Sequence, residues 1–434
     1  MADIHTPNNL LRDNNVFWYT AQDPAPPRAL SGAVRADAVI VGGGMTGLSC
    51  AQKLRDAGLA VVVLERDFCG AGASGKTSGF ITPDSEIVLS AVIASRGPAR
   101  AKRIWEFVLS GVEVIRNTIG RHGIACDYQI QDSLFISNSR AAQRSVEEEH
   151  RARASLGYTS RLYDMNDIKS AVGSDRYAGG VRFPDTFGIN SYLYCQGLRA
   201  VLADAGVPIY EGSGVTRVSH DGARTAAGAV YAKHVIVCTD RFLPDLTPVQ
   251  KEIYHVQTFL GVSQPLADRD AQRVFPDGNL MVWDTDLVYN YFRMAGQNRI
   301  LLGGGDLRYT YARAVSANTS RFKKRLERYF ARQFPQIPLT LEYVWPGMLG
   351  VSKDLLPIMG PNPAMPNVWY VGAATGLPWA AALGVYAADR ILSGRDEFDE
   401  EFSWRRRFFI GPRLQTLLTT PLTYAVSHGI AEHL

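Results

Sequence analysis

The sequence predicts a fold of the α/β (α+β) class, with a largely parallel, doubly wound sheet in one domain and an antiparallel sheet in another. Three patterns predict it: strand–helix–strand over residues 36–65, short alternating strands over 251–306, and a late strand and helix within 368–393. Alternating strands and helices favour a parallel sheet, whereas consecutive strands favour an antiparallel one. We therefore expect the chain to contain both.

Length, charge and cysteine content set the broad class of protein. The chain of 434 residues is longer than one compact core usually holds, which favours two domains. The net charge is only +4 and there is no long Lys/Arg run, so nucleic-acid binding is not expected. The five cysteines are scattered without a CxxC pair, so we expect neither a disulfide framework nor a metal site.

The apolar residues give no membrane signal. No stretch approaches ~18 uninterrupted apolar residues, the length that a spanning helix needs. The first residues lack the basic region and apolar run of a signal peptide. We therefore expect no membrane span and a cytoplasmic location.

The first ordered unit is a strand, a helix and a second strand. Residues 38–41 are short, apolar and β-branched, as in a buried parallel strand. From Met45 onward, apolar residues recur every three positions, which predicts a helix that ends near Gly58. Residues 61–64 form the second buried strand, which ends at Glu65.

A glycine motif lies between this first strand and its helix. Gly42, Gly44 and Gly47 form G-x-G-x-x-G, which permits a tight turn, a close approach of backbone to pyrophosphate, and close helix–strand packing. The helix N-terminus adds free N–H groups and a positive dipole end. Glu65 lies roughly twenty residues further on, where an acid accepts hydrogen bonds from ribose hydroxyls. The pattern predicts a Rossmann-like dinucleotide-binding domain.

A second loop of small residues follows, at positions 70–79, with the sequence GAGASGKTSG. It contains too much glycine to form core. A loop of this kind can wrap a flavin and its diphosphate, whereas a simple NAD-dependent dehydrogenase does not need one. The two loops together favour FAD over NAD as the cofactor.

The remainder of the chain mixes helices with strands. Helices are expected at 98–122, 140–157, 318–333 and 376–393, and antiparallel strands at 212–239. Cofactor signals lie at both ends of the chain, so we expect a discontinuous FAD-binding domain. Its segments would be 36–95, 185–245 and 344–395, with a substrate domain from 96–184 and 246–343 and a helical extension over 396–434.

Several motifs together resemble a known family. They are Phe17-Trp18-Tyr19, Glu65 with the G-A-S-G loop, Trp345-Pro346-Gly347 and residues 372–376. They look like the amino-acid and amine oxidase group of FAD enzymes typified by D-amino acid oxidase and sarcosine oxidase. Within it, the likeness is strongest to the gamma-glutamylputrescine oxidoreductases. The resemblance covers roughly residues 15 to 395 and implies an FAD enzyme that oxidises an amine or amino acid.

The motifs and the resemblance together give a set of expected FAD contacts. They are Gly42, Gly44, Met45, Thr46, Gly47, Glu65, Arg66, Ala73, Ser74, Lys76, Thr77, Ser78, Val215, Thr239, Gly347, Gly376, Leu377, Pro378 and Trp379. Lys76-Thr77 and Leu377-Pro378 depart from the family pattern. Some relatives attach FAD through Cys or His, but neither stands at the matching positions, so the resemblance implies non-covalent FAD.

The expected substrate residues lie on an antiparallel strand over 287–294. Alternation places Tyr289, Tyr291 and Arg293 on one face, where two hydroxyls and a guanidinium can hold a carboxylate or amide. Arg293 could instead pair permanently with an acid such as Asp284 or Asp306. His255 either tunes amine protonation or is structural, and Trp379 either walls the cavity or is core.

The expected reaction is oxidation of a C–N bond, with hydride transfer to flavin N5 and hydrolysis of the resulting imine. The expected partners are a small amine or amino-acid substrate and O₂. Two alternatives remain open: a dehydrogenase that passes electrons to a quinone or carrier protein, and a flavin-binding protein without turnover. The basic and aromatic residues 404–409 either contact anionic lipid at a membrane surface or pack on the protein.

Overall fold

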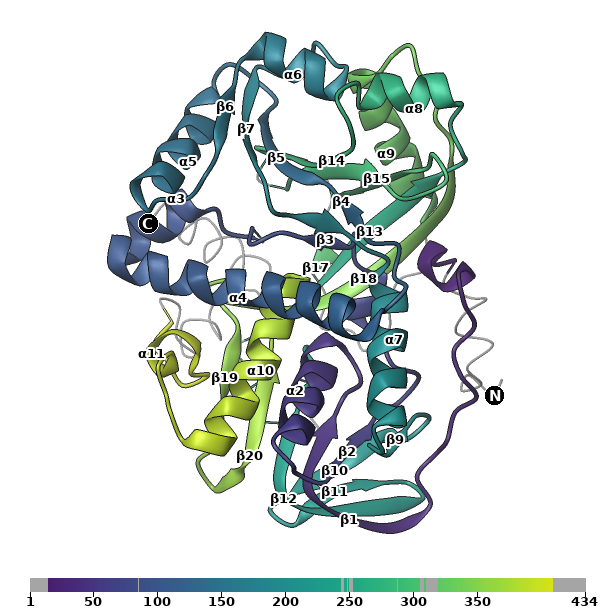
Figure 1. Cartoon of the computed structure of the whole chain (residues 1–434), viewed down its shortest axis with the longest axis vertical. Helices are drawn as coiled ribbons and strands as arrows, with labels where there is room; N and C mark the ends of the chain where they lie inside the picture. The colour runs from purple at the N-terminus through teal and green to yellow at the C-terminus, as the bar shows by residue number, and fades with distance from the viewer. Residues whose placement is uncertain are drawn as a thin grey trace.

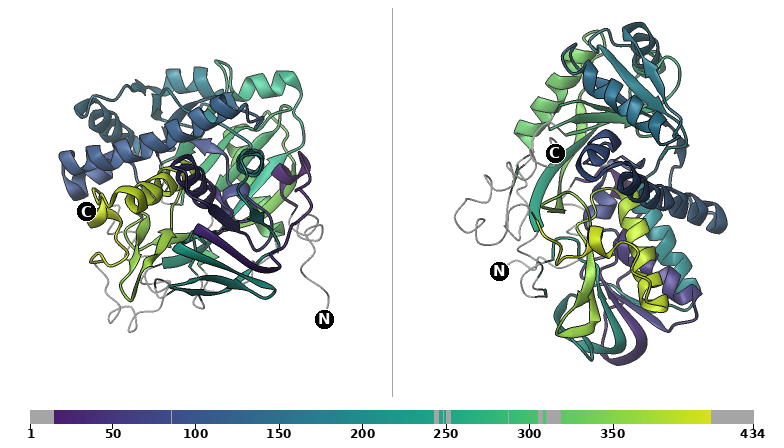
Figure 2. Two further views of the ribbon diagram at one scale, coloured as in Figure 1. Left: turned by 60° about the horizontal axis from the view of Figure 1, so that its bottom comes forward. Right: turned by 90° about the vertical axis from the view of Figure 1, so that its left-hand side faces the viewer.

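A computed structural model describes residues 15–408, except for 85, 243–245, 248, 250–252, 287, 305–307 and 310–318. Figure 1 shows two large sheets toward opposite ends of the molecule, with the long helix α4 (Pro98–His122) crossing between them. The two further views in Figure 2 show the same separation of the sheets. The chain passes between the two sheets several times.

The first sheet has the parallel core that the sequence predicts. Its parallel strands run in the order β9-β2-β1-β12-β20. Their bounds are β1 (Gly32–Val41), β2 (Val61–Leu64), β9 (Ile209–Tyr210), β12 (Gly228–Val237) and β20 (Met365–Gly372). Three strands add antiparallel pairs: β10 (Val215–Ser219), β11 (Gly222–Thr225) and β19 (Ile358–Asn362). Parallel pairing brings the carboxyl ends of the core strands to one edge.

Helices cover one face of this sheet. They are α2 (Met45–Asp56), α7 (Ser191–Asp204) and α10 (Leu377–Ser393), with α4 packed on α10. On this face Ala38 and Ile40 pack into the helical core, whereas Val39 and Val62 pack with strand and loop residues on the other face. The sheet is therefore Rossmann-like but not doubly wound, because the described residues of the second core come from strands and loops.

The second sheet is antiparallel apart from one parallel pair. Its strand order is β17-β13-β16-β15-β14-β5-β7-β6, with β18 also paired to β13. The parallel pair is β5 with β14. The bounds are β5 (Asp132–Ser137), β6 (Arg161–Tyr163), β7 (Gly179–Phe183), β13 (Ile253–Ser263), β14 (Leu280–Asp284), β15 (Asn290–Met294), β16 (Ile300–Gly304), β17 (Arg308–Tyr309) and β18 (Leu341–Ser352).

The remaining elements surround this second sheet and the junction. The helices are α3 (Leu89–Arg96), α5 (Gln143–Ser155), α6 (Met165–Val172), α8 (Asp268–Val274) and α9 (Ser320–Gln333). A small sheet at the junction contains β3 (Phe80–Ile81), β4 (Gln129–Ile130) and β8 (Phe187–Gly188). Short 3-10 helices occupy Phe17–Thr20 and Ala73–Lys76.

Two elements lie across the domain boundaries expected from the sequence. Residues 344–352 of β18 are expected in the FAD-binding domain, but the whole strand pairs with β13 of the second sheet. Helix α4 was assigned to the substrate domain, but its apolar face packs with α10 in the core of the first sheet. Both elements lie at the junction between the sheets, so they couple the two parts of the molecule.

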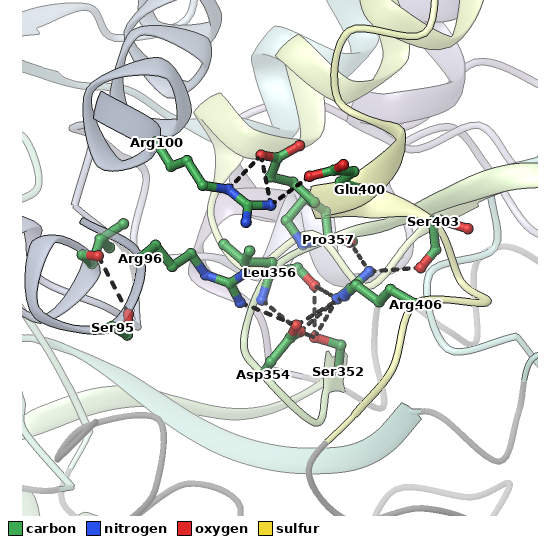
Figure 3. A network of polar contacts seen from close by, with 12 residues as sticks. Ser95, Arg96, Arg100, Ser352, Asp354, Leu356, Pro357, Glu400, Ser403 and Arg406 are labelled. Carbon is green, nitrogen blue, oxygen red and sulfur yellow. Dashed lines mark hydrogen bonds and ion pairs between the residues drawn. The ribbon is translucent and has the colours of Figure 1, made fainter. Parts of the chain in front are cut away.

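The described part of the C-terminal extension packs on the protein. Arg406 binds both carboxylate oxygens of Asp354, and its Nη1 donates to the carbonyl of Pro357 at 3.0 Å (Figure 3). Trp404 donates to the carbonyl of Pro361 at 3.2 Å. The expected helical extension begins with the short α11 (Asp399–Phe402), whereas residues 409–434 lie outside the described part. Among the described residues, no helix has the length and apolar content needed to cross a membrane.

Candidate active site

A cavity of about 600 Å³ lies where the carboxyl edge of the parallel sheet meets the second sheet. The first sheet contributes the glycine loop after β1, the end of β2 and residues 238–241 after β12. The small-residue loop 70–79 and the N-terminus of α10 form further walls. Strands β13, β15 and β18 close the opposite side. The edge at which parallel strands end is the usual ligand site of such sheets.

The glycine loop has the geometry that its motif predicts. Gly42 has φ of +114°, and a Cβ there would lie 2.6 Å from the carbonyl oxygen of Cys238. A Cβ on Gly47 would lie 2.0 Å from the carbonyl oxygen of Gly42, so only glycine lets α2 start this close to β1. The turn therefore presents the N-terminus of α2 to the cavity.

Glu65 lies at the end of β2 and lines the cavity. Its carboxylate accepts hydrogen bonds from the backbone N–H of Gly43 at 2.7 Å and of Asp67 at 2.9 Å. Burial raises the pKa of Glu65, although these two backbone bonds oppose the effect. The two bonds hold the carboxylate beside the glycine loop, where the sequence places an adenosine ribose.

The loop 70–79 is fastened through its carbonyl groups by aromatic side chains. Trp18 Nε1 donates to the carbonyl of Thr77 at 2.7 Å, and Trp345 Nε1 donates to that of Lys76 at 3.1 Å. Tyr19 donates to the carbonyl of Ala71 at 3.2 Å. The aromatic residues before β1 thus act as a support for the loop. Because three of its carbonyls accept these hydrogen bonds, the backbone of the loop is held in place at the cavity.

Three cations line this end of the cavity: Arg66, Lys76 and Arg241. Burial, with smaller contributions from the charges of the two arginines, lowers the pKa of Lys76 to about 8, although the charge of Asp67 opposes the shift. Burial also lowers the pKa of Arg241. Arg66 is exposed and pairs with Asp67 at 3.2 Å, whereas Lys76 and Arg241 are partly buried. Partly buried cations are unfavourable without an anion, so this end of the cavity fits a diphosphate.

Helix α10 begins at the cavity wall. Gly376 and Leu377 line the cavity, and Pro378 occupies the first turn, where its missing N–H costs little. Asp240, after β12, accepts a hydrogen bond from Gly350 N at 2.7 Å and further bonds from the backbone before Gly376. Burial raises the pKa of Asp240 to about 6. The carboxylate of Asp240 therefore connects three walls of the cavity: the segment after β12, strand β18 and the residues before α10.

The opposite end of the cavity is aromatic and acidic. Its walls include Phe80, Trp283 and Tyr291, and the rings of Phe80 and Tyr291 lie 5.8 Å apart. Tyr289 also lines it and donates a hydrogen bond to Glu86 at 3.2 Å. Burial, and then the charge of Glu86, raise the pKa of Tyr291, so its phenol is neutral at physiological pH. Of the four expected substrate residues, only the two tyrosines line the cavity.

The structure contradicts the expectation that Arg293 faces the cavity. Arg293 is 1% exposed, and its guanidinium donates to the carbonyls of Ser78, Ile189 and Met294 at 2.7–2.9 Å. It does not pair with Asp284, and Asp306 lies outside the described residues. Alternation along β15 places Arg293 on the same face as Tyr291, whereas Tyr289 precedes the strand. The backbone of residues 78–79 and 188–189 covers the end of the strand at Arg293. Arg293 therefore fastens the loop 70–79 through the carbonyl of Ser78.

Three further expected contacts lie away from the cavity. His255 Nε2 lies 2.8 Å from the carbonyl oxygen of Arg241, and burial lowers the pKa of His255. Trp379 packs in the helical core beside Phe107, with ring centroids 5.9 Å apart. Gly47 serves the packing of α2 on β1 and lies behind the loop.

All the other expected cofactor residues do line the cavity, although their contact with FAD stays a prediction. They are Gly42, Gly44, Met45, Thr46, Glu65, Arg66, Ala73, Ser74, Lys76, Thr77, Ser78, Val215, Thr239, Gly347, Gly376, Leu377 and Pro378.

Sequence reasoning missed four residues that line the cavity: Asp84, Glu86, Asp240 and Arg241. For the last two, a signal existed, because they directly follow a buried parallel strand. No local pattern marks Asp84, whose ion-pair partner lies 69 residues away.

No group of three or more His, Cys, Asp or Glu in the described ranges is arranged to bind a metal ion. All five cysteines are buried and unpaired. Cys238 lines the cavity, and burial raises the pKa of its thiol well above the ordinary value, so it is not a thiolate at neutral pH.

Comparison with known proteins agrees with the geometry of the cavity. The gamma-glutamylputrescine oxidoreductase of Escherichia coli is 29% identical over 370 residues, which are 84% of each chain. The probable oxidoreductase OrdL of Haemophilus influenzae is 28% identical over 376 residues, 83% of this chain and 84% of that protein. The crystal structure of glycine oxidase from Geobacillus kaustophilus has a TM-score of 0.73 at 18% identity, covering 87% of this chain and 100% of that one. The profile of the family "FAD dependent oxidoreductase" (DAO) matches residues 37–390, and the chain therefore belongs to that family of flavoenzymes.

Proposed function

We propose that this flavoenzyme oxidises the C–N bond of a small amine or amino acid to an imine, which water then hydrolyses. The single observation that carries the proposal is the two-ended cavity, with a dinucleotide site that continues into an aromatic chamber. The names of the relatives support the same class of reaction. When bound, FAD supplies the two-electron acceptor, which takes a hydride from the carbon next to nitrogen.

The chain's own residues orient the substrate and limit access of water. Phe80, Trp283 and Tyr291 form apolar walls that exclude water from the reacting carbon. The phenol of Tyr291 is neutral, so it acts as a hydrogen-bonding wall and not as a base. Hydride removal needs a neutral amine but no nucleophile from the protein.

FAD would be held without a covalent bond. Backbone N–H groups of the glycine loop, Glu65 and the cations Arg66, Lys76 and Arg241 fit the parts of a dinucleotide. Neither Cys nor His stands at 78–80 or 347–348, and the Cys238 thiol is protonated. We expect denaturation with acid to release all the flavin as FAD. Flavin that stays with the precipitated chain would contradict non-covalent binding.

The proposed electron acceptor is O₂, and the alternative is a quinone or carrier protein. Relatives of both kinds exist by name, such as the glycine oxidase and a D-amino acid dehydrogenase of Methylobacterium that is 25% identical over 329 residues. A cytoplasmic location and a peripheral membrane contact through the C-terminal tail stay predictions. The described residues of the tail pack on the protein, with Arg406 bound to Asp354.

An anaerobic screen tests the reaction. The purified holoenzyme is mixed with amines, N-methyl amino acids and D-amino acids while the flavin absorbance near 450 nm is followed. We expect at least one amine to bleach the flavin, and air to restore the colour with release of peroxide. Restoration by a quinone analogue but not by air would favour the dehydrogenase. No bleaching by any of these compounds would favour a flavin protein without turnover.

A further inference from the structure

A buried ion triad lies at the acidic end of the cavity. Both carboxylate oxygens of Asp84 accept from Arg153 Nη2, at 2.7 and 2.9 Å, and Glu149 accepts from Arg153 Nε at 2.9 Å. All three side chains are 3% exposed or less. Two carboxylates thus share one guanidinium, and at neutral pH the triad has a net charge of −1.

The guanidinium of this triad is not able to turn toward the cavity. Its carbon lies 3.6 Å from the centre of the Phe183 ring and 5.1 Å from that of Trp105. Glu149 is also fixed, because it accepts a hydrogen bond from Ser90 N at 2.9 Å. Asp84 is the member of the triad that lines the cavity. The excess negative charge is therefore presented to whatever occupies the cavity.

The pKa values agree with this charge balance. Burial and the charge of Glu149 raise the pKa of Asp84, and together they outweigh the lowering effect of Arg153. The ionised form of Asp84 is thus more costly than in water. A positive charge placed in the cavity would lower this cost, and a second negative charge would raise it.

The aromatic walls point to the same ligand charge by a separate argument. The ring of Phe80 lies 6.4 Å from that of Trp283 and 5.8 Å from that of Tyr291. Trp283 is held in place by a stacked contact with Phe135 at 6.1 Å. Ring faces attract ammonium groups, with the largest effect when water is excluded. Among the described residues that line this end of the cavity there is no Lys or Arg.

The reacting nitrogen does not suit this position. An amine must be neutral to lose a hydride from its neighbouring carbon, whereas an anionic neighbour favours the protonated form. An amine beside Asp84 would remain an ammonium ion and would not react. The group recognised at Asp84 must therefore be a different nitrogen of the same molecule.

We propose that the substrate is a diamine or polyamine, whose second, non-reacting ammonium group binds at Asp84 among the rings of Phe80, Trp283 and Tyr291. This inference rests on the function proposed above and narrows its substrate class. Amino acids with a free carboxylate would meet an uncompensated negative charge at the same place. Asp84 thereby acts as a specificity-determining residue, and Glu149 and Arg153 set its charge.

The test compares matched probes on the wild-type holoenzyme. Diamines with three to five methylene groups, the monoamines of equal length and the corresponding ω-amino acids are titrated anaerobically, and the apparent Kd for flavin reduction is measured. We expect each productive diamine to bind about tenfold or more tightly than its monoamine, the scale of one charged hydrogen bond, and the ω-amino acids to bind most weakly. Monoamines or amino acids that match the diamines would overturn the inference while leaving the proposed function intact. Failure of every amine would instead contradict the proposed function.

Variants then assign the preference to the triad. Asp84→Asn removes the excess charge, so the diamine-to-monoamine ratio should fall toward unity. Glu149→Gln removes the same charge, and Glu149 does not line the cavity, so this variant should also lower the diamine-to-monoamine ratio. If Asp84→Asn does not fold, Glu149→Gln alone tests whether the triad sets the preference. Asp132→Asn is the matched control, because Asp132 pairs with Arg182 at 2.7 Å outside the cavity. A diamine-to-monoamine ratio that is unchanged in both triad variants would show that the charge of the triad does not cause the preference for diamines.

Discussion

The two ends of the cavity differ in charge and in the part of the chain that builds them. At the cofactor end, three cations, Arg66, Lys76 and Arg241, surround a glycine-rich backbone. At the substrate end, the carboxylates of Asp84 and Glu86 lie among aromatic rings on β3, β14 and β15. One end therefore suits an anionic dinucleotide, and the other suits a cation.

The difference in charge between the two ends explains how one cavity can favour a different ligand at each end. The cofactor end presents mainly backbone groups, whose geometry short glycine motifs encode locally. The substrate end presents side chains that come from distant segments. Opposite charges at the two ends also disfavour an inverted arrangement, because a diphosphate would lie against Asp84 and an ammonium group against Lys76.

The largest expected effect comes from Arg293, which connects the two ends. Arg293→Met deletes a buried guanidinium and leaves the carbonyls of Ser78, Ile189 and Met294 without their donor. We expect the free energy of unfolding to fall by about 3–5 kcal/mol, measured by urea denaturation of the holoenzyme. FAD affinity should fall with it, because Ser78 belongs to the loop 70–79, which lines the cofactor end of the cavity.

The matched control for this change is Arg182→Met, which removes a half-buried arginine from β7 of the same sheet without touching the cavity. It should cost less stability and leave FAD affinity unchanged. If Arg293→Met folded normally, kept its FAD and lost only substrate affinity, Arg293 would belong to the substrate end after all.

An intermediate effect is expected at Lys76, and it depends on pH. Because burial lowers the pKa of Lys76 to about 8, the apoprotein loses this positive charge as the pH rises through 8. Affinity for the anionic cofactor should therefore be highest below pH 8 and should decline between about pH 8 and 10, by up to roughly 1–2 kcal/mol. The dissociation constant of FAD, measured by flavin fluorescence over this range, checks the sign. Lys76→Met should bind FAD weakly and with little pH dependence, and the same decline in the variant would assign the titration to another group.

The smallest effect is expected at Tyr289, on the substrate end alone. Tyr289→Phe removes the hydrogen bond to Glu86 but keeps the ring that lines the cavity. We expect the apparent substrate affinity to fall by about 1 kcal/mol, roughly fivefold, with the FAD dissociation constant unchanged. A change in FAD affinity of the same size would show that the two ends are not independent.

The contrast between features encoded locally and features that depend on distant segments explains which predictions from the sequence were confirmed. Helix α4 begins and ends at the predicted residues, Pro98 and His122, because a strong amphipathic stripe is bounded by glycine on both sides. The unit from β1 to Glu65 was also predicted, since its strands, turn and helix depend on neighbours within about thirty residues. The helix α7 was missed because its apolar residues are spread around the helix and do not form a clear stripe.

Long-range packing accounts for the predictions that were wrong. Arg293 shares a face with Tyr291, as alternation requires, but whether that face is open depends on segments 78–79 and 188–189, which are distant in sequence. Trp379 follows directly after the cavity residue Pro378, but the helix turns its side chain toward Phe107. One residue along a helix changes direction by about 100°, so proximity in sequence does not place a side chain in a cavity.

The sequence by itself determined the cofactor end of this protein: its parallel strands, its glycine turn, Glu65 and the small-residue loop 70–79. These features are encoded locally, because a tight turn, a helix N-terminus and a strand end fix the backbone over a few residues. The tertiary structure alone decided the substrate end. The charge of Asp84 depends on Arg153 and Glu149, which α5 brings to it across more than sixty residues. Net charge in a buried site is the sum over all the groups that packing places there, and no local pattern contains that sum.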